Sequence, residues 1–257
     1  MSRFIDKLKH ASVSEPAPLG FRTVQKAIKP RLLIIALLEK PDVPETVDIT
    51  TVADACLFNT KKLTEYKSVE KIAKSIKDMP CGCRIGGNFN IDFEKTAIDF
   101  VVFSDEMPAS ALLKSEKTGR IVLAEEDMTG EMIRILDVMP QDAVFLDEKS
   151  GEKLSLTWQK LTVYKRFSSL STKPLLISVP VNLTADELQT VWDMGVNGLV
   201  VNMAGAESFE ELKKLRKAVE ALLPPSKHKR KSRAIVPQVR TEAPAVADDD
   251  DDGEEDE

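Results

Sequence analysis

The stretch KPLLISVPVNLTADELQTVWDMGVNGLVVN, residues 173–202, contains one complete strand–helix–strand unit. Its first apolar run, Leu175–Val179, resembles the run Leu32–Leu38, whose continuous Leu, Ile and Ala residues are typical of a parallel strand covered on both faces. Its second apolar run is Leu199–Asn202. Between them, Thr184–Met194 has the apolar spacing of a helix. Gly195 fits the left-handed conformation just past a helix end. The unit therefore predicts a parallel strand pair joined by a helical crossover.

Outward from this unit, similar apolar runs recur along the chain, and most are followed by a helical pattern. The eight runs are Leu32–Leu38, Ala53–Phe58, Cys83–Ile85, Phe100–Ser104, Ile121–Ala124, Ala143–Leu146, Leu175–Val179 and Leu199–Asn202. Eight strand–helix units are what a closed (βα)8 barrel requires. We therefore expect an α/β fold, a (βα)8 TIM-like barrel whose strands pair in sequence order.

Helical patterns fill most of the intervals between these runs. We expect helices at Leu63–Ile76, Phe89–Ala97, Pro108–Leu113, Thr129–Val138, Ser155–Leu170, Thr184–Met194 and Ser208–Leu222. Thr184 with Glu187, and Ser208 with Glu211, have the spacing of a capping box at a helix start. Trp158 and Trp192 fall on helical patterns, so packing is the plainer interpretation of both.

The even-numbered strands share a polar residue at their start. The four segments read VADACLFN, AIDFVVFS, PQDAVFLD and GVNGLVVN. This alternation indicates a barrel assembled from two-strand modules. The phrasing resembles (βα)8 proteins of the phosphate-binding and aldolase-like groups from about Pro30 to Leu223, and it is also similar to uncharacterised bacterial barrel proteins. The resemblance implies the TIM-like architecture and carries no catalytic motif of a named enzyme family.

The chain divides into three regions of different composition. Residues 1–29 form a lead-in whose Phe4, Ile5 and Leu8 predict a short amphipathic helix docked on the barrel as a plug. The barrel is expected over residues 30–223. Residues 224–257 are a low-complexity tail, basic in KHKRKSR and then acidic in DDDDDGEEDE, which we expect to be disordered.

The charge pattern and the cysteine content indicate the cellular compartment of the protein and the kinds of partner it can bind. The three cysteines form no disulfide framework and no CxxC pattern, and no run is long and apolar enough to span a membrane. We expect a cytoplasmic protein with no membrane partner. The basic run has no interleaved aromatic residues and is followed by an acidic run, which disfavours nucleic acid as a partner. The oligomeric state does not follow from the sequence.

Active sites of this fold lie at the carboxyl ends of the strands. Asp105, Glu125 and Asp147 follow the fourth, fifth and sixth runs, so they are expected on one side of the barrel mouth. Carboxylates converging there are suitable ligands for Mg²⁺. The alternative is that they cap the following helices, where acidic residues are favoured.

Five further residues are candidates for binding a ligand at the same rim. They are Arg84, Asn88, Asn182, Asn202 and Ser208. Arg84 is the most unusual polar residue in any predicted strand and could bind a carboxylate or phosphate bidentately. It could equally pair with an inner acid, and Ser208 could serve only as a helix cap.

The positions of the histidines and lysines disfavour two common catalytic mechanisms. The only histidines, His10 and His228, lie outside the predicted barrel, and no lysine lies inside strands four to eight. Histidine catalysis and Schiff-base formation on a strand lysine are therefore disfavoured. The leading hypothesis is a barrel that binds a small anionic metabolite at its carboxyl-end rim. The alternatives are a magnesium-dependent lyase or isomerase and a non-catalytic scaffold or interaction barrel.

Overall fold

Eight parallel strands close into a barrel in sequence order, as the apolar runs predict. The computed structural model describes residues 2–12, 32–38, 49–60, 69–70, 72–73, 76, 79–86, 93–147, 156–203 and 207–223. The strands are β1 (Leu33–Leu38), β2 (Ala55–Thr60), β3 (Cys81–Ile85), β4 (Phe100–Phe103), β5 (Gly119–Ala124), β6 (Ala143–Leu146), β7 (Leu175–Val179) and β8 (Gly198–Asn202). The closing pair is β1 with β8, with Ile35 opposite Val200.

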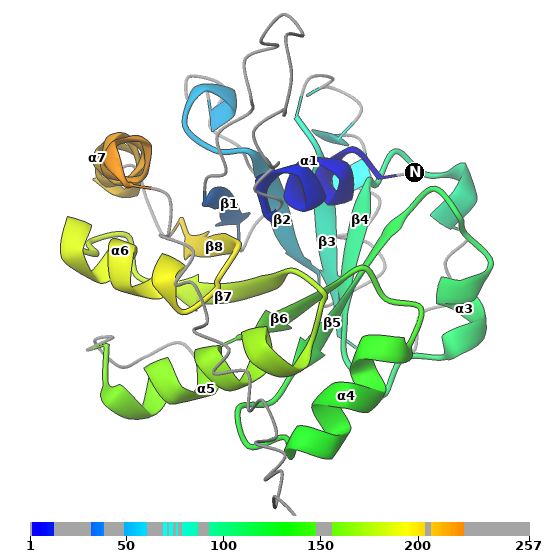
Figure 1. The fold of residues 1–257 in the computed structure, drawn as a ribbon. Coiled ribbons are helices and arrows are strands. Elements are labelled where there is room, and N and C mark those ends of the chain that lie inside the picture. The colour runs from blue at the N-terminus through cyan, green and yellow to red at the C-terminus, as the bar shows by residue number, and fades with distance from the viewer. Residues whose placement is uncertain are drawn as a thin grey trace, which may run out of the picture. The chain divides into compact units, whose positions relative to one another are not determined.

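Helices cover the outside of the barrel (Figure 1). They are α3 (Ala109–Leu113), α4 (Gly130–Val138), α5 (Trp158–Leu170), α6 (Ala185–Asp193) and α7 (Glu207–Ala221), and α1 (Arg3–Ser12) precedes the barrel. Within the described residues, the connection from β3 to β4 contains a short 3-10 helix at Phe93–Lys95, where the sequence predicts a helix over Phe89–Ala97. Most of the helix predicted at Leu63–Ile76 lies outside the described residues.

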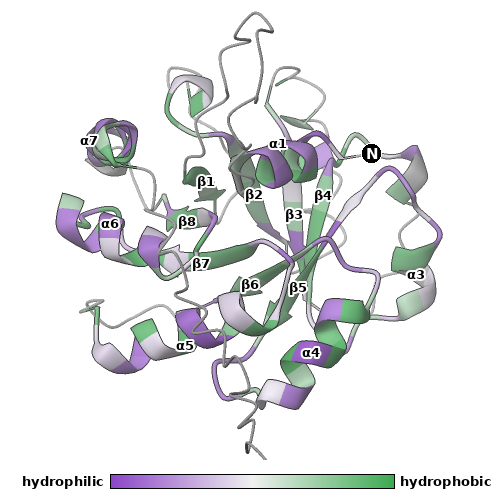
Figure 2. Ribbon diagram, in the orientation of Figure 1, coloured by the Kyte–Doolittle hydropathy of each residue, from purple (hydrophilic) through white to green (hydrophobic). Residues whose placement is uncertain are grey.

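The barrel interior is filled by every second strand residue. Leu33, Ile35 and Leu37 of β1, with Ala143 and Phe145 of β6, belong to one buried cluster inside the strands. The intervening residues pack outward against the helices in two further buried clusters. Figure 2 shows the result as apolar strands surrounded by helices that are polar on one side. This alternation identifies which side chains point into the barrel.

The polar residue that begins an even-numbered strand pairs with the preceding odd-numbered strand at the amino end of the barrel. In three of the four modules, this polar residue forms two hydrogen bonds with one residue of the preceding strand. Its backbone N–H donates to the carbonyl of that residue, and its side-chain oxygen accepts the N–H of the same residue. The side chain thus satisfies an amide that the parallel ladder leaves free. The pairs are Asp54 with Ile34 (3.0 Å), Asp142 with Arg120 (2.9 Å) and Asn197 with Leu175 (2.9 Å).

Asp99 holds the corresponding position in the remaining module, but its carboxylate is used differently. Its own N–H donates to the carbonyl of Cys81, as in the other modules. Its two oxygens instead accept the Ser2 hydroxyl at 2.7 Å and the N–H groups of Arg3 and Phe4 at 2.8 and 2.9 Å. These N–H groups are at the start of α1, where a helix leaves its amides without internal partners and favours negative charge.

Helix α1 therefore plugs the amino end of the barrel, as its apolar spacing predicts. Phe4, Ile5 and Leu8 are buried in the interior cluster, and the Phe4 ring lies 4.4 Å from that of Phe100. A Cβ atom at position 119 would lie 2.5 Å from Ile5 Cγ1, so the close approach of α1 to β5 requires Gly119. The plug leaves the carboxyl end as the place for a binding site.

Two compact units divide the chain, Met1–Ser226 and Lys227–Glu257. The barrel belongs to the first unit. The second unit and the rest of the predicted tail lie outside the described residues. Among the helices of the described part of the chain, none has the length and apolar character needed to cross a membrane.

Candidate functional site

Polar side chains line the carboxyl end of the barrel interior. Each lies two residues beyond an inward-facing position of its strand, so strand alternation directs it into the mouth. All are partly exposed to solvent. The residues are Asn59 of β2, Arg84 of β3, Ser104 just after β4, Asp147 just after β6, Ser178 of β7 and Asn202 of β8. The mouth is therefore polar and partly exposed at these positions, in contrast to the apolar interior below it.

Arg84 and Asp147 form an ion pair across the mouth, in which Arg84 Nη1 donates to Asp147 Oδ2. Strands β3 and β6 are not neighbours in the barrel, so the two side chains meet over its interior. Their side chains are 26% and 13% exposed. Of the two roles that the sequence leaves open for Arg84, ligand binding and pairing with an inner acid, the structure shows the pairing.

The backbone of Arg84 is held firmly in the sheet. Its residue is opposite Asn59 on one side and Val102 on the other. The hydroxyl of Thr60 also donates to the Arg84 carbonyl at 2.6 Å. Among the described residues, Asp147 is the only acceptor of the guanidinium group. Because a guanidinium carries five N–H donors, several remain available to a ligand that enters the mouth.

The three carboxylates predicted to bind Mg²⁺ occupy different environments. Asp105 and Glu125 are exposed and lie in the turns after β4 and β5. Asp147 faces inward and is engaged by Arg84. Within the described residues, which include all three, no group of three or more His, Cys, Asp or Glu side chains could hold a metal ion. The magnesium site stays a prediction.

The other predicted ligand residues are spread around the rim. Asn202 faces the mouth, and Asn182 is exposed in the loop after β7. Asn88 lies outside the described residues, and the side chain of Ser208 is not described. Helix α7 begins at Glu207, so Ser208 lies in its first turn and the predicted cap at Ser208 is wrong.

Helix α6 is capped as the sequence predicts. The Thr184 hydroxyl accepts the N–H of Glu187 at 3.3 Å, and the Glu187 carboxylate accepts the Thr184 N–H at 2.9 Å. The Thr184 hydroxyl also donates to the Glu187 carboxylate at 2.7 Å. The hydrogen bonds that this carboxylate accepts from the Thr184 N–H and then from the Thr184 hydroxyl lower the pKa of Glu187. The start of α6 is thus satisfied within the protein and is not a ready site for an external anion.

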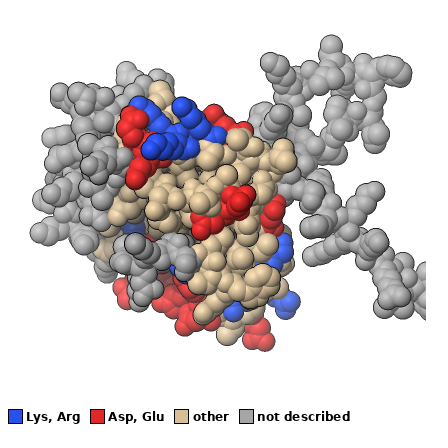
Figure 3. All heavy atoms as spheres, turned by 90° about the vertical axis from the view of Figure 1, so that its left-hand side faces the viewer, with Lys and Arg blue, Asp and Glu red and all other residues tan. Residues whose placement is uncertain are grey.

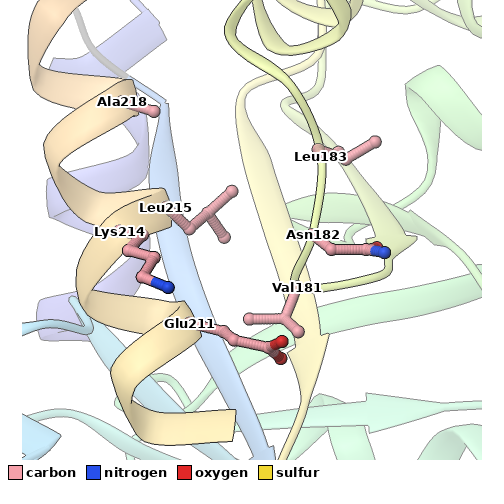
Figure 4. Close-up of a pocket in the computed structure, with 7 residues that line it drawn as sticks. All are labelled: Val181, Asn182, Leu183, Glu211, Lys214, Leu215 and Ala218. Atoms are coloured by element: carbon pink, nitrogen blue, oxygen red, sulfur yellow. The ribbon is translucent and has the colours of Figure 1, made fainter.

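A pocket of about 320 Å³ lies between the loop after β7 and helix α7. Figure 4 shows Leu215 of α7 and Val181 of the loop pointing toward one another, while the Asn182 amide points away from α7. The α7 side of the pocket carries two charged residues, Glu211 and Lys214. From the sequence, Glu211 was considered only as part of a capping box, and Lys214 was not singled out. Their position on the helix after the last strand was the available signal.

The three cysteines are buried and are not nucleophiles. Burial raises the pKa of Cys56 and of Cys83 far above the ordinary range. Burial also raises the pKa of Cys81 to about 11, with a smaller opposing effect of Arg3. Since the thiolate is the reactive form, none of these residues supplies covalent catalysis.

The two tryptophans lie in different environments, although the sequence predicts that both are packing residues. Trp192 is 7% exposed and packs between α6 and the strands. Trp158, at the start of α5, is 82% exposed, so the prediction is wrong for this residue. A helical pattern does not distinguish an inner from an outer face when the helix lacks a strong apolar stripe.

Comparison with known proteins supports the architecture. The structure is similar to a tryptophan synthase alpha-subunit variant from the hyperthermophile Pyrococcus furiosus, with 16% identity, 75% of this chain and 98% of that chain covered, and a TM-score of 0.55. It is also similar to a protein from Aquifex aeolicus VF5, with 14% identity, 74% and 93% coverage, and a TM-score of 0.54. The chain is a TIM barrel. No family model and no curated protein matches the sequence. At these identities the likeness shows the fold alone.

Proposed function

We propose that this barrel binds a small anionic molecule, carrying a phosphate or carboxylate group, at its carboxyl-end mouth. The observation that supports the proposal is the inward-facing Arg84, held over the mouth by Asp147 from the opposite side. A guanidinium matches the geometry of phosphate and carboxylate groups and binds them through paired N–H donors. Asn59, Ser178 and Asn202 face the same space and add neutral hydrogen-bonding groups.

The anion site is favoured over the two alternatives. A magnesium-dependent lyase or isomerase would use Asp147 as a metal ligand, but this carboxylate is already paired with a cation. A purely structural barrel would be expected to fill its mouth with apolar side chains, whereas the inward positions here are polar and partly exposed. We place the protein in the cytoplasm, consistent with its buried, unpaired cysteines.

A binding panel tests the proposal. Inorganic phosphate, glycerol 3-phosphate, pyruvate and succinate are added to the full chain at constant ionic strength, and the unfolding midpoint is measured. At least one anion should raise the midpoint by binding to the folded state. Arg84→Met should abolish that rise. Arg134→Met removes the same charge from the exposed outer face of α4 and should preserve it.

Two results would overturn the proposal. One is an unchanged midpoint with every anion of the panel at millimolar concentration. The other is an equal response of the wild-type protein and the Arg84→Met variant, which would place the bound anion elsewhere.

A further inference from the structure

The pocket between the β7–α6 loop and α7 combines an apolar surface with two opposite charges. Val181 of the loop faces Leu215 and Ala218 of α7 across it, and Leu183 of the loop also lines it. Leu215 is only 2% exposed and belongs to the buried cluster between the helices and the strands, so it lies at the base of the pocket. The volume of about 320 Å³ is within the range of sites for small organic ligands. The lining residues all belong to the described part of the chain.

Glu211 and Lys214 supply the charges. They are three residues apart on α7, which places them on the same helix face about 5–6 Å apart at their Cβ atoms. Neither forms an ion pair or hydrogen bond with any residue that the structure describes. The adjacent Glu210 and Lys213 behave differently, since they pair with each other at 2.8 Å. Figure 3 shows the face of the molecule that carries this mixture of basic and acidic side chains.

We propose that this pocket binds a free α-amino acid with an aliphatic side chain. Its ammonium group would bind the Glu211 carboxylate, and its carboxylate would bind the Lys214 ammonium group. Its side chain would then contact Val181 and Leu215. An α-amino acid suits this arrangement because it carries opposite charges beside one apolar group. Arg84 does not line the pocket, so the site is separate from the anion site in the mouth.

Calorimetric titration of the full chain with L-leucine tests the proposal. Three related compounds each remove one recognised feature: 4-methylpentanoate lacks the ammonium group, isopentylamine lacks the carboxylate, and glycine lacks the side chain. We expect L-leucine to bind and each of the three to bind about tenfold more weakly or worse, as expected for loss of one charge-assisted or apolar contact. Equal binding of L-leucine and 4-methylpentanoate would overturn the proposal, as would no binding of L-leucine at millimolar concentration.

Matched variants on the same helix locate the site. Glu211→Gln and Lys214→Met should each weaken L-leucine binding about tenfold, whereas Glu210→Gln and Lys217→Met make the same charge changes away from the pocket and should leave it unchanged. All four positions are exposed, so the unfolding midpoints without ligand should stay at the wild-type value. Arg84→Met should also leave L-leucine binding intact. Equal weakening by Glu211→Gln and Glu210→Gln would contradict the assignment.

Discussion

At the amino end of the barrel, Asp54 and Asp142 accept backbone N–H groups of neighbouring strands, and Asp99 accepts those of α1. At the carboxyl end, Arg84 is the only donor to Asp147 in the described part of the chain, and it donates from its side chain. The first group of carboxylates satisfies backbone amides of the strands and of α1 and so belongs to the fold. The second holds a partly exposed cation in a polar opening.

This difference indicates that residues at the amino end stabilise the barrel, whereas residues at the carboxyl end are available for binding. A carboxylate that accepts a buried backbone amide cannot be removed without leaving that amide unsatisfied. A carboxylate that accepts only from a partly exposed guanidinium can be removed at a smaller cost, because water can replace it. The amino end also carries the packed plug α1, whereas the described part of the mouth has polar side chains at the corresponding inward positions. We infer that substitutions at the two ends will have different consequences.

The largest effect is expected from Phe4→Ala, which removes the ring that packs on Phe100 inside the barrel. A fully buried phenylalanine replaced by alanine costs about 3–5 kcal/mol of unfolding free energy. Chemical denaturation measures the loss. Trp158→Ala, which removes an exposed aromatic ring at the opposite end, should change the free energy by less than about 0.5 kcal/mol. Similar losses in both variants would mean that α1 does not stabilise the barrel.

Asp99→Ala should have the next largest effect. It removes the acceptor for the Ser2 hydroxyl and for the first amides of α1, at a cost of about 2 kcal/mol. Asp105→Ala makes the same substitution in an exposed turn at the carboxyl end and should cost less than about 0.5 kcal/mol. Denaturation curves of the two variants decide the point, and a larger loss for Asp105→Ala would reverse the proposed difference between the ends.

A smaller effect is expected at Asp137, which joins the end of α4 to the segment before β7. Partial burial acts to raise the pKa of Asp137, but hydrogen bonds from Thr172 and Ser171 outweigh it and lower the pKa. The resulting stabilisation is therefore full above the ordinary value of 3.8 and is lost as the pH falls through the lowered value.

Asp137→Asn should accordingly be less stable than the wild type at neutral pH, by under about 1 kcal/mol because the site is near the surface. The difference should shrink as the pH is lowered below 3.8. Unfolding midpoints of both proteins across this range measure it. A difference that grows on acidification would have the wrong sign.

The barrel could be predicted from the sequence because short stretches of residues indicate each strand and each two-strand module. Continuous apolar runs, such as Leu33–Leu38, indicate buried parallel strands, and the polar residue before each even-numbered strand indicates the module. The function of Asp99 could not be predicted in this way. It contacts the start of α1, more than ninety residues away in sequence, and its local sequence resembles that of Asp54 and Asp142.

The candidate site was predicted in its parts but not in its arrangement. Arg84 and Asp147 were both singled out by their places at strand ends, one as a ligand residue and the other as a metal ligand. Their pairing depends on closure of the barrel, which brings β3 and β6 to face one another across the interior. The pocket at Lys214 depends on how the β7–α6 loop lies against α7, which no local pattern determines.

The most direct test of the difference between the two ends is the unfolding free energy of Asp54→Ala beside that of Asp147→Ala. Asp54 accepts the Ile34 N–H and also pairs with Arg216 at 2.9 Å, so Asp54→Ala removes both interactions and should cost about 3 kcal/mol. Within the described residues Asp147→Ala frees only Arg84, whose side chain is partly exposed, and it should cost less than about 1 kcal/mol. Equal losses, or a larger loss for Asp147→Ala, would contradict the account.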